Sequence, residues 1–204
     1  MSILEYNGAA MIAMAGKDCV GIAADRRLGI QLQTVAMDFE KVFQMGPKLF
    51  VGLAGLATDV QTLRNLLKFR LGLYELREER QMSPQVFSHL LSTILYEKRF
   101  GPYFCEPIVA GLDESGKPFL SGSDLIGATV KTDDYVVSGT CTGNLHGMCE
   151  TLFKPDMEPD QLFETLAQSL LASVDRDAMS GWGGVVHIIT KDGVTTKELK
   201  GRQD

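Results

Sequence analysis

The sequence has few of the features that mark membrane-spanning or secreted proteins. Its apolar runs are short and fall far below the roughly 20 consecutive residues that span a bilayer. The first ten residues, MSILEYNGAA, have neither the basic start nor the apolar core of a signal peptide. We therefore expect no targeting or membrane segment, and a location in the cytoplasm and nucleus.

Cysteine, histidine and tryptophan are also scarce. The 204 residues include four cysteines, three histidines and one tryptophan. The cysteines stand singly or within apolar runs, without the paired spacing of a zinc site or the density of a small disulfide-rich scaffold. They are Cys19, Cys105, Cys141 and Cys149, and the histidines are His89, His146 and His187. We predict reduced, packed cysteines, no metal site and no cofactor.

Basic charge is in short supply, since 20 lysines and arginines stand against 26 aspartates and glutamates, a formal net charge of -6. Nucleic acids and anionic membranes bind clustered basic surfaces, so we expect neither as a partner. The chain is 45% hydrophobic and has no low-complexity linker, fixed-period repeat or break in composition. These properties predict one domain, residues 1–204, with a sizeable core.

Short apolar segments bounded by glycine and proline predict strands. These segments are Ala10–Ala15, Cys19–Asp25, Lys41–Gln44, Lys48–Ala54, Pro107–Leu112, Pro118–Gly122 and Tyr135–Ser138, and two more strands close the chain. The earliest of them are apolar at almost every position. Both faces of their sheet must therefore be covered.

Apolar residues at intervals of three and four predict four helices. They run from Leu56 to about Arg77, from the capping residue Ser83 to about Arg99, from about Gly143 to Phe153, and from Pro159 to Val174. The order is thus strands, two helices, strands, two helices, strands. Two stacked sheets with a helix pair outside each bury these elements most simply. We therefore predict an α+β fold, a four-layer αββα sandwich.

Five stretches, in this order, resemble the β subunits of the 20S proteasome: GIAADRR, GLAGLATDVQTL, YEKRFGPYF, VVSGT and LFETLAQSLLASVDRDAMSGWGG. The resemblance extends over almost the whole chain and agrees with the predicted order of elements. It implies the fold of the N-terminal nucleophile hydrolases. In active members of that family, an N-terminal threonine supplies the attacking hydroxyl and its own α-amine acts as the base.

The resemblance also implies the residues around such a nucleophile. Asp25 matches the acid that orients the catalytic lysine. Lys41 matches that lysine, whose ammonium lowers the pKa of the amine and stabilises developing negative charge. The other matches are Gly55 as an oxyanion donor, Ser138 as a supporting serine, and Asp177 and Ser180 as the second acid and serine beside the nucleophile.

The nucleophile itself is missing from the position that this register requires. Counting back sixteen residues from Asp25 leads to Ala9, directly after Gly8, where active members have Gly-Thr. Alanine has no side-chain oxygen or sulfur with which to attack a peptide, and the same hydroxyl would be needed for the self-cleavage that matures these subunits. We expect residues 1–8 to stay attached as an N-terminal extension, and the pocket to be vestigial.

The resemblance therefore implies a non-catalytic structural subunit of a threonine-type endopeptidase complex. Such a subunit fills a place in an inner β ring of the 20S core particle, and is needed to assemble the complex that degrades mostly ubiquitinated proteins in an ATP-dependent pathway. Its implied partners are β type-2 and type-4 ring neighbours, the outer α ring, the opposite β ring and, indirectly, the regulatory particle.

Three alternatives remain open. An active hydrolase could use Ser2 after removal of Met1, but Ser2 lies seven residues before position 9, about 20 Å if extended, so the chain would have to fold back. A thiol hydrolase could use Cys141 or Cys149 with His146, although nothing in the sequence marks a depressed thiol pKa. A homo-oligomeric bacterial-type peptidase would need the terminal threonine that is missing.

Overall fold

Two five-stranded antiparallel sheets form the inner layers of the molecule. The computed structural model describes residues 2–203. In order of hydrogen bonding, the first sheet contains β10 (Tyr135–Gly139), β1 (Ala10–Gly16), β2 (Cys19–Asp25), β11 (Gly184–Thr190) and β12 (Val194–Leu199). The second contains β5 (Val42–Gly46), β6 (Leu49–Gly55), β7 (Cys105–Leu112), β8 (Pro118–Ser123) and β9 (Thr129–Thr132).

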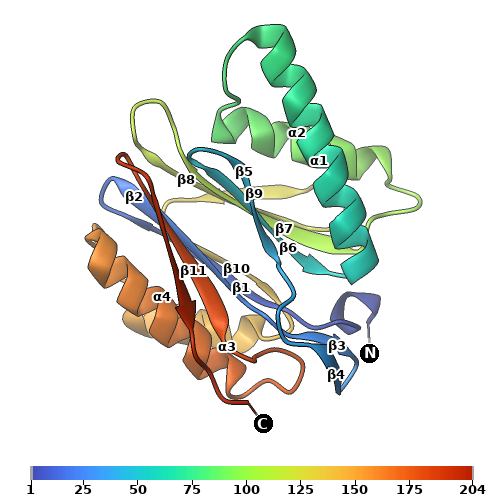
Figure 1. Ribbon diagram of the computed structural model, residues 1–204, viewed down its shortest axis with the longest axis vertical. Helices are drawn as coiled ribbons and strands as arrows, with labels where there is room; N and C mark the ends of the chain where they lie inside the picture. Colours follow the sequence, from blue (N-terminus) through green and yellow to red (C-terminus); the bar gives the residue numbers. More distant parts are fainter. Residues whose placement is uncertain (1, 204) are drawn as a thin grey trace.

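Helices cover the outer face of each sheet (Figure 1). The helices α1 (Ala57–Glu78) and α2 (Pro84–Glu97) lie on the second sheet, and α3 (Thr142–Leu152) and α4 (Pro159–Val174) lie on the first. The predicted four-layer αββα sandwich is therefore confirmed.

Three apolar clusters join the four layers. Successive side chains of a strand point to opposite faces, and in β1 both sets are buried. Met11 and Ala13 belong to the cluster between the sheets, whereas Ile12 and Met14 belong to the cluster beneath α3 and α4. A third cluster packs α1 and α2 on the second sheet. Because both faces are covered, these strands are apolar almost throughout.

The strands and helices whose bounds the sequence predicts are present, and those bounds differ from the observed ones by no more than two residues. The hydroxyl of Ser83 accepts a hydrogen bond from Val86 N (3.4 Å), as expected of the cap of α2. Lys41, predicted as the first residue of a strand, lies immediately before β5.

Four short elements lie outside the sequence predictions. They are the 3-10 helix η1 (Ile3–Glu5), the strands β3 (Leu28–Ile30) and β4 (Gln33–Ala36), and β9. The strands β3 and β4 form a separate two-stranded hairpin. These elements are short, and all of their residues except Gly29 are at least partly exposed, so no apolar run marks them in the sequence. Within residues 2–203, no helix combines the length and the apolar character needed to cross a membrane.

Candidate functional site

The predicted site residues gather where β1 begins and β2 ends. Gly184, the first residue of β11, pairs with Asp25 at the end of β2. Gly139, the last residue of β10, pairs with Ala10 at the start of β1. The loop 175–183, which connects α4 to β11, completes this region. Segments around residues 10, 25, 139 and 175–184 therefore meet at one end of the first sheet.

The carboxylate of Asp25 links these segments. Its Oδ1 accepts hydrogen bonds from Lys41 Nζ (2.6 Å) and Ala10 N (2.9 Å). Its Oδ2 accepts from Gly181 N (3.0 Å) and Arg27 N (3.4 Å). A buried carboxylate is tolerated only where such donors replace water. Asp25 therefore orients Lys41 and also fixes β1 and the loop 175–183.

The ammonium of Lys41 lies between Asp25 and the peptide bond that precedes Ala9. Its Nζ donates to Gly8 O (3.2 Å), and only 3% of the Lys41 side chain is exposed. Burial lowers the pKa of this ammonium below its ordinary value, and the charge of Asp25 opposes that shift. The cation thus lies against the carbonyl group that self-cleavage would attack.

Ala9 lies between this ion pair and a second polar group, but it contributes only a methyl side chain. Its carbonyl accepts from Thr140 N (2.7 Å). Thr140 Oγ1 lies 3.1 Å from the same carbonyl oxygen and 2.6 Å from Asp177 Oδ2. Ser180 Oγ donates to Asp177 Oδ2 (2.6 Å). The structure thus brings Asp25, Lys41, Asp177 and Ser180 together around Ala9.

Gly8 enters the site in a backbone conformation that favours glycine. Its φ is +73°, and a Cβ atom at this position would lie 1.8 Å from Met179 O. No side chain fits at that distance. The residue before Ala9 is therefore held directly against the loop 175–183.

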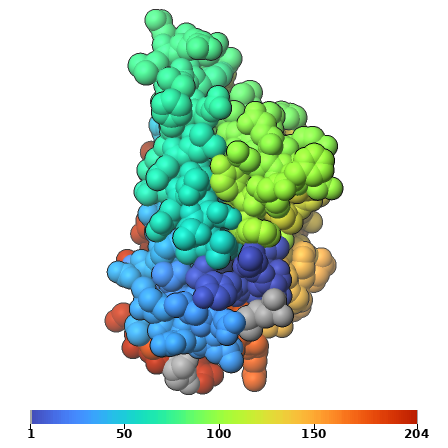
Figure 2. Space-filling model, turned by 90° about the vertical axis from the view of Figure 1, so that its right-hand side faces the viewer, coloured from blue at the N-terminus to red at the C-terminus, as the bar shows by residue number. Residues whose placement is uncertain are grey.

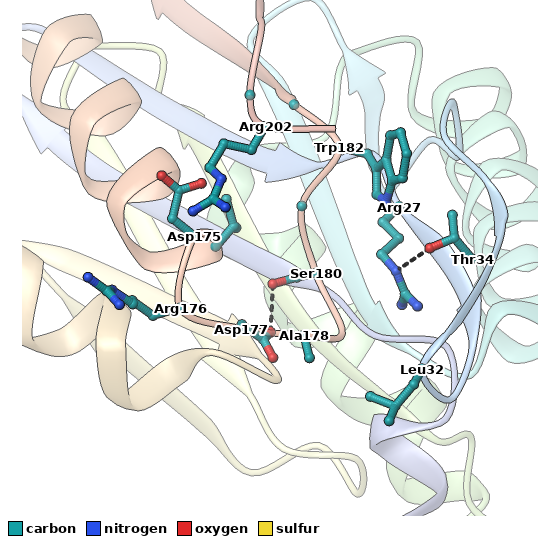
Figure 3. A pocket seen from close by; sticks show the side chains of 14 residues that line it. Arg27, Leu32, Thr34, Asp175, Arg176, Asp177, Ala178, Ser180, Trp182 and Arg202 are labelled. Atoms are coloured by element: carbon teal, nitrogen blue, oxygen red, sulfur yellow. Dashed lines mark hydrogen bonds between the residues drawn. The ribbon is translucent and has the colours of Figure 1, made fainter. Parts of the chain in front are cut away.

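A cavity of about 530 Å³ lies beside this polar cluster. Figure 3 shows Arg27 and Thr34 on one side of it and Asp177 with Ser180 on the other. The buried Arg27 side chain donates to Met179 O (2.7 Å) and Thr34 Oγ1 (3.0 Å). Arg27 thereby ties the loop 175–183 to the hairpin of β3 and β4.

The structure places the two remaining predicted residues beside the cluster. The hydroxyl of Ser138 donates to Glu106 O (3.1 Å), a link between β10 and β7. Gly55, at the end of β6, lines a cavity of about 240 Å³ together with Thr140 and Ser2. Glu106 borders the same cavity, and burial, followed by the charge of Asp124, raises the pKa of its carboxyl group.

The chemistry of the thiols does not favour a thiol hydrolase. Cys141 and Cys149 are buried, and burial raises the pKa of each to about 12. A thiolate is therefore scarce at neutral pH. The imidazole of His146, the proposed partner of these thiols, packs edge-on against Tyr135, with 5.9 Å between the ring centroids. Among the residues that the structure describes, no three histidine, cysteine or acidic side chains are grouped as metal ligands would be.

One geometric requirement of the Ser2 alternative, that the chain fold back toward the site, is met. The extension does turn back, so that Ser2 lines the cavity beside Gly55. However, Ser2 N donates to Glu5 Oε2 (2.9 Å), and Ser2 Oγ accepts from Leu4 N (3.3 Å). Both groups that a terminal nucleophile would need are used to cap η1.

Sequence reasoning missed three residues of this site. Thr140 directly follows Ser138 and Gly139 in the matched stretch VVSGT, so its hydroxyl could have been considered. Gly181 N contacts Asp25 from 156 residues away, and Arg27 contacts Met179 O from 152 residues away. Nothing local in the sequence marks those two contacts.

Comparison with known proteins gives a consistent assignment over the whole chain. A family model described as proteasome subunit matches residues 5–189. Proteins named proteasome subunit beta type-3 from Dictyostelium discoideum and Drosophila melanogaster are 60% and 59% identical over 205 residues. A probable proteasome subunit beta type-3 from Schizosaccharomyces pombe is 54% identical over 204 residues. Each alignment covers 100% of both chains.

Proposed function

The chain belongs to the proteasome subunit family, and we propose that it is a non-catalytic structural subunit of an inner β ring of the 20S core particle. Family membership makes it a component of a peptidase complex that assembles with other proteasome subunits. Full-length identity to subunits named beta type-3 supports the structural role rather than the serine or thiol hydrolase alternatives.

The observation that carries the proposed lack of activity is the side chain at position 9. The Asp25–Lys41 pair and the Thr140–Asp177–Ser180 group both contact the main chain around Ala9. A methyl group cannot attack a carbonyl carbon or lose a proton to a base. The pocket thus supplies orienting charges and donors with nothing for them to activate.

The same missing atom supports the retention of residues 1–8. Self-cleavage in this family would need the hydroxyl that Ala9 lacks, so the Gly8–Ala9 peptide bond persists in the proposed subunit. We regard residues 1–204 as one proteasome β-type domain with a retained N-terminal extension. The matched residues Ala9, Asp25, Lys41, Gly55, Ser138, Asp177 and Ser180 then form a vestigial pocket.

The proposed place of the chain also defines its partners. The sequence identity to subunits named beta type-3 favours β type-2 and type-4 subunits as ring neighbours, with the α ring and the opposite β ring above and below. The complex would degrade mostly ubiquitinated proteins in an ATP-dependent pathway, in the cytoplasm and nucleus, and would connect to the regulatory particle indirectly.

The intact mass of the chain from the purified native core particle tests this proposal. A mass that includes residues 2–8, with or without Met1 and N-terminal acetylation, is expected. A second aliquot is treated with an electrophilic probe that forms an adduct with N-terminal threonines. Labelling of the catalytic subunits but not of this chain supports the proposal. A chain that begins at Ala9, or that carries the probe, contradicts it.

A further inference from the structure

The end of the N-terminal extension lies between α1 and the β3–β4 hairpin, which are not consecutive in the sequence. We call residues 6–8 the strap. Figure 2 shows the N-terminal residues, in dark blue, between α1 in teal and the light-blue segment that contains β3 and β4. The strap therefore borders both the helix layer and the hairpin.

One side chain of the strap connects to α1. Ala57 is the first residue of α1, and its N-cap residue Leu56 makes no side-chain capping hydrogen bond. The first N–H groups of a helix have no partner within the helix. Asn7 Oδ1 accepts from Ala57 N (2.8 Å). Asn7 thus acts as a capping residue supplied from 50 residues away.

The same side chain connects to the hairpin. Asn7 Nδ2 donates to Gly29 O (2.8 Å) in β3. The strap main chain adds two bonds: Gly29 N donates to Asn7 O (3.1 Å), and Gln31 N donates to Tyr6 O (2.8 Å). The amide of Asn7 therefore uses its acceptor on the helix and its donor on the hairpin.

The hairpin needs such support. A two-stranded hairpin is marginally stable alone, and its register shifts between Leu28 and Gly29. Several of its large apolar side chains are exposed, including Ile30, Leu32 and Val35. Few buried contacts hold it, so the strap and the Arg27 side chain supply much of its attachment.

We propose that Asn7 is a positioning residue, and that the strap holds the β3–β4 hairpin and the first turn of α1 in one arrangement beside the vestigial pocket. This inference rests on the proposed retention of residues 1–8, because cleavage after Gly8 would remove Asn7. The extension then has a structural task of its own. Residues 1–8 would be retained because Ala9 lacks the hydroxyl needed for cleavage, and their retention would also stabilise the fold.

Two substitutions of Asn7 separate its two contacts. Asn7→Ala removes both hydrogen bonds. Asn7→Asp keeps an acceptor for Ala57 N, and its negative charge suits a helix N-terminus, but it has no donor for Gly29 O. Ser2→Ala is the matched control, since it changes the same extension and disturbs only the exposed cap of η1.

Hydrogen exchange of assembled core particles that contain each variant, read by mass spectrometry, gives the test. Asn7→Ala should accelerate exchange about fivefold, both in the first turn of α1 and across residues 28–36, as expected for loss of a capping bond. Asn7→Asp should accelerate exchange across residues 28–36 alone. Ser2→Ala should leave both regions unchanged.

The outcomes are decisive in both directions. Unchanged exchange in both regions of Asn7→Ala overturns the proposal, as does equal acceleration of both regions in Asn7→Asp. If Asn7→Ala does not enter particles, the regional selectivity of Asn7→Asp decides. The intact mass of the unaltered chain in the same preparation reports separately whether residues 2–8 are retained, so failure of the proposed function is distinguishable from failure of this inference.

Discussion

Lys41 Nζ lies 2.6 Å from Asp25 Oδ1, and both side chains are withdrawn from solvent. The two members of this pair are not equally supported. Asp25 also accepts from three main-chain N–H groups, whereas Lys41 donates to one further group, the carbonyl of Gly8. Each residue therefore leaves a different defect when it is removed.

Removal of Asp25 should be the more damaging change. Asp25→Ala leaves the buried Lys41 ammonium without its carboxylate partner and three main-chain N–H groups without an acceptor. This change should destabilise the fold by about 3–5 kcal/mol. Lys41→Met leaves a carboxylate that still has its main-chain donors, so we expect a loss of about 1–3 kcal/mol. Incorporation into core particles and thermal release of the subunit would measure both. Equal losses, or a greater loss for Lys41→Met, would contradict a mainly structural role for Asp25.

Ala9→Thr should restore self-cleavage. The new hydroxyl would attack the carbonyl carbon of Gly8, the amide nitrogen would leave as the amine of residue 9, and water would hydrolyse the resulting ester. Lys41 already donates to the carbonyl oxygen on which charge would develop. The intact mass should show loss of residues 1–8. Ala9→Val is the matched control, because it has nearly the shape of threonine without the oxygen, and it should stay uncleaved.

Gly8→Ala should prevent normal folding of the site. A Cβ atom there would lie 1.8 Å from Met179 O, and the φ of +73° adds strain. We expect a loss of more than about 2 kcal/mol and poor incorporation into particles. Gly72→Ala in α1 has no atom within 4 Å of the added Cβ. It should instead stabilise the helix by up to about 1 kcal/mol. Tolerance of Gly8→Ala would mean that the strap follows another path.

His187 should make stability depend on pH below neutrality. Burial lowers its pKa below the ordinary 6.5. The unfolded chain then binds a proton at a higher pH than the folded chain, so the free energy of unfolding falls as the pH decreases below about 6.5. For one proton the slope is at most about 1.4 kcal/mol per pH unit. Thermal release of the subunit between pH 5 and 7 should show this slope.

Two histidine variants serve as the comparison. His187→Gln should flatten the slope, because glutamine does not titrate. His89→Gln, on the exposed surface of α2, should preserve it. A slope that persists in His187→Gln would assign the pH dependence to another group.

The four cysteines should resist alkylation in the native particle. All are buried, and burial raises the pKa of Cys19 to about 11 and of Cys105 to about 12. With Cys141 at about 12 as well, the thiolate fraction at pH 8 is on the order of one in a thousand for Cys19 and one in ten thousand for Cys105 and Cys141. Iodoacetamide should label these thiols only after denaturation. Rapid native labelling of Cys141 would revive the thiol hydrolase alternative.

Much of the fold could be predicted because strands with two buried faces are conspicuous in the sequence. The residues of β1 and β2 are apolar almost throughout, since one face meets the second sheet and the other meets the helices. The strands β3 and β9 could not be found in this way. Only Gly29 among their residues is buried, and their pairing depends on neighbours that the rest of the fold positions.

The candidate site was predictable where the family register applies and unpredictable where contacts depend on tertiary structure. Resemblance identified Asp25 and Lys41, and the structure places them in contact. Asn7 offered no signal, because its amide matters only when residues 29 and 57 lie on either side of it. Ser138 matches a supporting serine by resemblance, but in the structure its hydroxyl donates to Glu106 O and links β10 to β7.

The strand order of the first sheet has a consequence for biosynthesis. β2 lies between β1 and β11, yet β11 is made last but one among the strands of the described chain. At 5–20 residues per second, the ribosome needs on the order of ten to thirty seconds to progress from Asp25 to Gly184. During that interval one edge of an apolar strand has no partner. Nascent chains are therefore exposed to mispairing, and to capture by chaperones, until β11 has been synthesised.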